Sequence, residues 1–235
     1  MTSTEIRSTP FMRELISFAG SDVSSHRPQR RAFLENRGVG KTPALASAVA
    51  ALMGQGKHER VWVVAHASRA GINLGHLVAE MIQSQFSTSV DVDCDVLLRD
   101  EPAEGWKEKD NKACAMTMRV SGIRPDKTLF TTTAVFLGAG NDFHVPSSEL
   151  SDALALRPTA IFGDEPLYYT SGVLGELLRL DASVVVLTGT SFDTTIPKEF
   201  AESCERGLVS VSWYQFGEPH VVPLTDSLGG MAIVA

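Results

Sequence analysis

Cysteine and histidine are scarce, and neither is arranged as a set of metal ligands. The 235 residues include three cysteines and six histidines. Cys94, Cys114 and Cys204 lie far apart and form no C-x-x-C pair, and the histidines show no ligand spacing. A structural zinc site is therefore not expected. A disulfide framework is not expected either, so the sequence predicts buried or free thiols in a reducing compartment.

The sequence also lacks the apolar segments that membranes and secretion require. No apolar run approaches the length of a membrane span. The polar residues 1–10 lack the apolar core of a signal peptide. We therefore expect a cytoplasmic protein, located in the host cytoplasm if the chain is viral. The apolar residues 229–235 are either the cut edge of a domain from a longer polyprotein or an ordinary final strand.

Positive charge is in short supply as well. Lysine and arginine number 21 against 28 aspartates and glutamates, which gives a net charge of −7. The surface as a whole should not attract nucleic acid, so any such site is a local, salt-sensitive groove. The apolar share of 43% and the charged share of 21% are typical of a soluble globular protein. The length suffices for one large domain, or one domain with an appendage.

A glycine turn followed by a lysine and a hydroxyl residue is the strongest functional motif. Residues 33–43 read F-L-E-N-R-G-V-G-K-T-P, which predicts a strand, a loop and the start of a helix. Lys41 is expected to reach the outer phosphates of a nucleotide, and the Thr42 hydroxyl to bind Mg²⁺. The helix adds the positive end of its dipole. Glu35 stands where the full P-loop pattern has glycine, so the match covers its second half. The phosphate-binding residues are expected to be Gly38, Val39, Gly40, Lys41 and Thr42.

Apolar runs alternate with helical patterns along the chain. Residues 61–65 are a continuous apolar run, as expected for a parallel strand covered on both faces. Residues 184–191 predict a second buried strand, which ends in small hydroxyl residues. Residues 43–53 have helical propensity, and residues 72–86 carry apolar side chains at a helical period. The alternation predicts an α/β fold with a mostly parallel central sheet and helices on both faces.

The remaining elements follow from shorter patterns. Residues 1–28 are Ser/Thr-rich and predict a partly ordered arm with a short helix near residues 11–18, ahead of a domain at 29–235. Residues 90–98 predict a solvated edge strand. The other expectations are an edge strand at 116–120, a strand at 128–133 followed by a helix from 134–137, helices at 147–155 and 198–206, and strands at 208–213 and 221–224.

An acidic pair follows a short apolar strand directly, in the run T-A-I-F-G-D-E-P at residues 159–166. An aspartate at the carboxyl end of a buried strand faces the crevice where open α/β sheets bind ligands. Asp164 is therefore expected to hold Mg²⁺, and Glu165 to orient and deprotonate the attacking water. The alternative is an exposed acidic turn at a strand end.

The order of these motifs resembles the first RecA-like domain of superfamily 2 helicases, above all the DExH-type enzymes encoded by RNA viruses. The resemblance covers residues 29–191. Residues 38–42 resemble motif I and residues 164–167 motif II. The other similar segments are 63–69 to motif Ia, 131–137 to motif Ib and 188–190 to motif III.

The resemblance implies a RecA-like P-loop NTPase domain that binds ATP or another NTP with Mg²⁺. Its catalytic residues would be Lys41, Asp164 and Glu165. It implies RNA rather than DNA as the nucleic acid, and as a further partner a second RecA-like domain, which we expect this chain to lack, or another viral replication protein. The residues implied to contact the nucleic-acid backbone are Ser68, Arg69, Thr132 and Thr133. Those implied to couple hydrolysis to strand separation are Thr188, Gly189 and Thr190.

Three functional hypotheses remain open from the sequence. The leading one is an ATP-dependent RNA helicase or NTPase domain, which the resemblance assigns to a virus. The second is a ring-forming P-loop motor for packaging or translocation, in which a neighbouring subunit presents an arginine finger. The third is a helicase fold without catalysis that serves as a scaffold. It is motivated by Glu35 in the loop and by Leu167, where the helicase family has histidine or aspartate.

Overall fold

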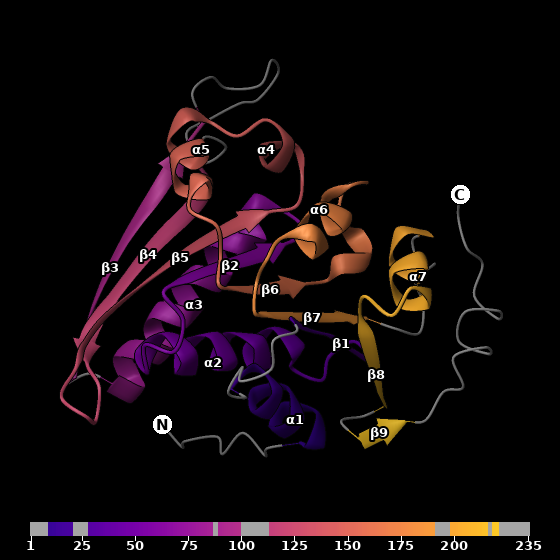
Figure 1. Ribbon diagram of the computed structural model, residues 1–235, viewed down its shortest axis with the longest axis horizontal. Helices are drawn as coiled ribbons and strands as arrows, with labels where there is room; N and C mark the ends of the chain where they lie inside the picture. The colour runs from indigo at the N-terminus through magenta and orange to yellow at the C-terminus, as the bar shows by residue number, and fades with distance from the viewer. Residues whose placement is uncertain are drawn as a thin grey trace.

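The computed structural model describes residues 9–20, 28–86, 89–99, 113–190, 198–215 and 218–220. Within these residues nine strands form one sheet, in the order β3-β4-β5-β2-β6-β7-β1-β8-β9 (Figure 1). The strands are β1 (Gln29–Glu35), β2 (Arg60–Ala65), β3 (Val90–Leu98), β4 (Ala113–Ile123), β5 (Leu129–Gly138), β6 (Ala160–Asp164), β7 (Val184–Thr190), β8 (Ser210–Gln215) and β9 (Glu218–His220).

The central six strands of the sheet are parallel. β5, β2, β6, β7, β1 and β8 pair in parallel, while β3 and β4 on one side and β9 on the other add antiparallel pairs. The carboxyl ends of the parallel strands therefore meet at one edge. There Glu35 pairs in register with Thr190, and Asp164 with Thr188.

Helices cover both faces of the sheet (Figure 1). One core contains side chains of α1 to α3 and the other contains side chains of α5 to α7. Along β1 the side chain of Phe33 joins the first core, whereas Ala32 and Leu34 join the second. The mixed α/β fold and mostly parallel sheet predicted from the sequence are thus confirmed. The helices are α1 (Pro10–Ala19), α2 (Lys41–Gly54), α3 (Ser68–Phe86), α4 (Asn141–His144), α5 (Ser148–Ala155), α6 (Val173–Arg179) and α7 (Lys198–Glu205).

The antiparallel part of the sheet differs from the prediction in two respects. β5 continues through residues 134–137, where a helix was expected, because Val135 and Phe136 are buried on opposite faces as strand residues. β4 lies between β3 and β5 and is not an edge strand. β3 is the edge of the sheet, and its acidic residues are exposed, as predicted. Residues 221–224, predicted as a strand, lie outside the described part of the chain.

Helix α1 packs into the domain. Phe11 and Leu15 are fully buried, and the Phe11 ring meets the rings of Phe33 and Tyr214 edge-on. Glu14 forms an ion pair with Arg31 and accepts a hydrogen bond from the Tyr214 hydroxyl. The short helix predicted in the N-terminal arm therefore belongs to the first core. None of the helices in the described segments is long and apolar enough to cross a bilayer.

Truncation of Phe11 tests whether α1 is part of the core. Phe11→Ala should lower the free energy of unfolding by about 3–5 kcal/mol, because it removes a fully buried ring. Ile16→Ala on the exposed side of the same helix is the control and should cost less than about 1 kcal/mol, since the Ile16 side chain is 38% exposed. Urea unfolding measures both variants. Equal midpoints for the two would show that α1 does not pack on the sheet.

Candidate nucleotide-binding site

The loop between β1 and α2 holds Lys41 in an inward position. Gly38 and Gly40 have φ angles of 81° and 83°, a left-handed conformation that favours glycine. Helix α2 begins directly after Gly40. The Lys41 side chain is only 6% exposed, and its Nζ donates a hydrogen bond of 3.0 Å to the carbonyl oxygen of Asn36. The loop thus places an ammonium group at the N-terminus of a long helix, where anions bind.

Asp164 ends β6 and faces the start of α2. The Thr42 hydroxyl donates to its Oδ2 over 2.9 Å, and the Thr188 hydroxyl donates to its Oδ1 over 3.0 Å. Burial raises the pKa of the Asp164 carboxyl. The two hydroxyl hydrogen bonds oppose this change in the pKa, and the charge of Glu165 adds to it. A hydroxyl and a carboxylate in contact are oxygen ligands of the kind that Mg²⁺ prefers.

Glu165 is held in place by β7. Its carboxylate accepts hydrogen bonds from the Thr190 backbone N–H (2.8 Å) and the Thr190 hydroxyl (2.7 Å). The Lys41 Nζ lies 3.7 Å from Glu165 Oε1. The backbone of Glu165 has φ 56° and ψ 55°, a left-handed conformation that costs a non-glycine residue on the order of 1–2 kcal/mol. Strained residues of this kind cluster at functional sites.

These groups surround one pocket of about 510 Å³ at the carboxyl edge of the sheet. Its walls are formed by Arg37, Gly38, Gly40, Lys41, Thr42, Pro43, His66, Glu165, Tyr168 and Thr190. Asp164 is 7% exposed and contacts the pocket wall through Thr42. Two other hollows lie against the antiparallel strands and contain no residue of the loop.

Three lining residues were missed by sequence reasoning. The Arg37 guanidinium donates to the Tyr168 hydroxyl over 3.2 Å, which joins the loop to the turn after the acidic pair. His66 follows the carboxyl end of β2. Arg37 and His66 lie inside the segments 33–43 and 63–69, and Tyr168 directly follows 164–167, so their place in these motifs was the only available signal.

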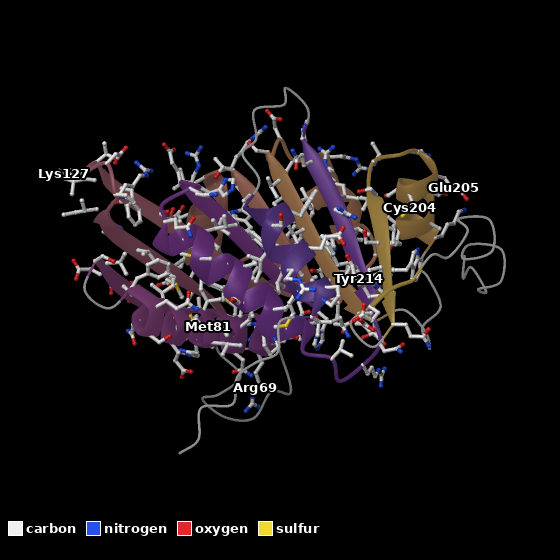
Figure 2. The ribbon with its side chains drawn as sticks, turned by 90° about the horizontal axis from the view of Figure 1, so that it is seen from below. Arg69, Met81, Lys127, Cys204, Glu205 and Tyr214 are labelled. Carbon is white, nitrogen blue, oxygen red and sulfur yellow. The ribbon has the colours of Figure 1, made fainter. Side chains whose placement is uncertain are left out.

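The expected nucleic-acid residues do not lie together. Ser68 is the first residue of α3, and its hydroxyl donates a hydrogen bond of 2.6 Å to Asp142. Asp142 also forms an ion pair with Arg99. Arg69 is exposed at the periphery of the molecule (Figure 2). Both follow the carboxyl end of β2, on the same edge as the pocket.

Thr132 and Thr133 lie at the opposite edge of the sheet. Thr133 pairs in register with Arg60, the first residue of β2. Thr132 is fully buried, and its hydroxyl donates to the carbonyl oxygen of His58 over 2.7 Å. The prediction that these threonines end a strand was wrong, because β5 continues to Gly138. They are therefore not placed to share a path with Ser68 and Arg69.

The residues expected to couple hydrolysis to strand separation lie beside the acidic pair. The Thr188 hydroxyl donates a hydrogen bond to Asp164, and the Thr190 hydroxyl donates one to Glu165. Gly189 lies between them, where an added Cβ would lie 3.1 Å from the Leu34 side chain. Leu167 is buried in the core on the α5–α7 side and contributes packing.

Solved structures resemble this chain, whereas no protein-family model and no curated protein matches it. The large terminase of a thermophilic bacteriophage superposes with a TM-score of 0.55 at 9% identity, over 89% of this chain and 46% of the terminase chain. The same terminase in complex with ADP superposes with a TM-score of 0.52 at 10% identity, over 95% of this chain and 47% of the terminase chain. The terminase in complex with ATP-γ-S superposes with a TM-score of 0.51 at 8% identity, over 94% of this chain and 46% of the terminase chain.

This chain therefore spans less than half the length of those terminase chains. At such low identity the likeness shows the fold alone, which is the RecA-like P-loop fold. The finer resemblance to superfamily 2 helicases finds no support in these structures.

The raised pKa of Asp164 should appear in the pH dependence of stability. The folded protein holds this proton at pH values where the unfolded chain has released it. The contribution of Asp164 to the free energy of unfolding therefore rises as the pH falls from above the raised pKa toward the ordinary aspartate value. Because asparagine does not titrate, the difference between wild type and Asp164→Asn should change within that window and stay constant above it. Urea unfolding at a series of pH values measures the difference, and a constant difference throughout would contradict the assignment.

Proposed function

We propose that this chain is the nucleoside-triphosphate-hydrolysing domain of a viral packaging or translocation motor. The observation that carries the proposal is the convergence of Lys41, Thr42, Asp164 and Glu165 at one pocket, although the first two lie 122 or more residues before the others. The likeness to a bacteriophage large terminase, solved also in complex with ADP and with ATP-γ-S, favours the motor over the RNA helicase. A scaffold without catalysis has no need of this convergence.

The residues divide the reaction between them. The loop amides and the Lys41 ammonium bind the phosphates and neutralise charge that develops on the transferred group. Thr42 and Asp164 would hold Mg²⁺, which would supply positive charge beside the bound phosphates. Glu165 orients the attacking water and accepts its proton. Its carboxylate has lone pairs left for this role, because Thr190 donates only two hydrogen bonds to it.

Thr190 would transmit changes at the proposed catalytic base to the sheet. Its hydrogen bonds join the proposed catalytic base to the last residue of β7. A change in the Glu165 carboxylate during turnover therefore acts on β7. Arg69 and the start of α3 lie at the same edge of the sheet and are the proposed contacts to the nucleic-acid backbone.

Two substitutions separate binding from hydrolysis. Lys41→Ala should weaken Mg–ATP binding by at least about tenfold, because it removes a charged hydrogen-bond donor to phosphate. Glu165→Gln should leave binding within about threefold of wild type and lower turnover by a factor of roughly 100 or more, because general-base catalysis contributes about that much. Calorimetry and phosphate release measure the two quantities. Normal turnover by Glu165→Gln would refute the role of Glu165, and no wild-type binding at millimolar nucleotide would favour the scaffold.

A ring-forming motor makes a further prediction about concentration. If a neighbouring subunit supplies an arginine, turnover per chain should rise with protein concentration by a factor of about 1,000 or more as rings assemble. Light scattering at each concentration gives the assembly state. Turnover per chain that is independent of concentration, with a monomer throughout, would instead favour a single-chain enzyme. Stimulation by duplex DNA or by RNA, compared in the same assay, identifies the nucleic acid.

A further inference from the structure

Glu35 is a buried carboxyl group that has no role in the proposed hydrolysis. It is the last residue of β1, and its side chain is fully buried. Its Oε1 accepts a hydrogen bond of 2.7 Å from the backbone N–H of Asn36. Burying a carboxyl group is costly unless hydrogen bonds compensate it. The residue therefore needs a structural or functional explanation.

Asn36 connects Glu35 to the phosphate-binding lysine. The N–H of Asn36 is bound by Glu35, and its carbonyl oxygen accepts the hydrogen bond from Lys41 Nζ. Asn36 is therefore held from both sides at the start of the loop. Moving the Glu35 acceptor would release Asn36 and, with it, the group that fixes the position of the Lys41 ammonium.

The contacts of Lys41 also lead back to the strand pair that contains Glu35. Lys41 lies 3.7 Å from the Glu165 carboxylate, which Thr190 holds with two hydrogen bonds. Thr190 is in turn the register partner of Glu35 on the neighbouring strand. One strand pair thus anchors both the ammonium and the proposed catalytic base.

We infer that Glu35 is a positioning residue that sets the start of the phosphate loop and places Lys41 for the phosphates. The inference rests on the proposed function for its consequence, namely nucleotide affinity. Its direct effect, the position of Lys41, exists in the nucleotide-free protein. The two can therefore be tested separately.

Two substitutions at Glu35 separate the hydrogen bond from the packing. Glu35→Gln keeps an acceptor oxygen at the same reach, whereas Glu35→Leu has a similar size and no acceptor. The Leu variant should weaken Mg–ATP binding and raise KM by about tenfold, the effect of one lost hydrogen bond to a constrained site. The Gln variant should stay within about twofold of wild type. Glu35→Asp, which keeps the charge but shortens the reach, should change binding in the same direction as Leu and serves if the Leu variant does not fold.

Amine acylation measures the position of Lys41 without nucleotide. The wild-type side chain is 6% exposed and should react slowly. Its rate should rise severalfold in the Leu and Asp variants and not in the Gln variant, with the exposed Lys198 as the internal reference. Equal rates and equal affinities across the variants would overturn the inference. A change in acylation together with absent wild-type nucleotide binding would overturn the proposed function and keep the inference.

Discussion

The hydrogen bond between the Thr42 hydroxyl and the Asp164 carboxylate organises the site. It joins the first turn of α2 to the carboxyl end of β6, across 122 residues of sequence. Neither residue can make this contact unless β1 and β6 end at the same edge of the sheet, as the parallel pairing through β7 ensures. The contact therefore depends on the whole parallel sheet, and the proposed metal site depends on the contact.

The polar residues of the site share one side of the sheet. The even-numbered positions of β7 that point toward α2 carry valines in the first half of the strand and threonines toward its carboxyl end. β6 follows the same rule, with Phe162 in the core and Asp164 in the site. Because residues two apart on a strand lie on the same face, the last apolar core position of each strand is followed on that face by a polar residue of the site. Glu35 and Thr190 lie on this face as well.

The elements that could be predicted from the sequence are those whose signals are local. The glycine turn before Lys41 and the acidic pair after an apolar strand mark two strand ends, and the alternating pattern predicts the sheet that brings them together. The errors arose where position depends on pairing. Thr132 and Thr133 resemble a strand end, yet their register with the start of β2 places them at the far edge. The contacts of Arg37 with Tyr168 and of Glu35 with Asn36 depend on loop geometry that no residue pattern specifies.

The opposite face of the sheet carries a different kind of constraint. Toward α5, α6 and α7 the strand ends present Leu34, Leu187, Gly163 and Gly189. Leu167 is buried on the same side, and none of the proposed catalytic groups lies there. Substitutions at these apolar positions are constrained mainly by volume and hydrophobicity. A volume-conserving apolar substitution on this face should therefore leave the phosphate-binding groups in place, because those groups lie on the other face.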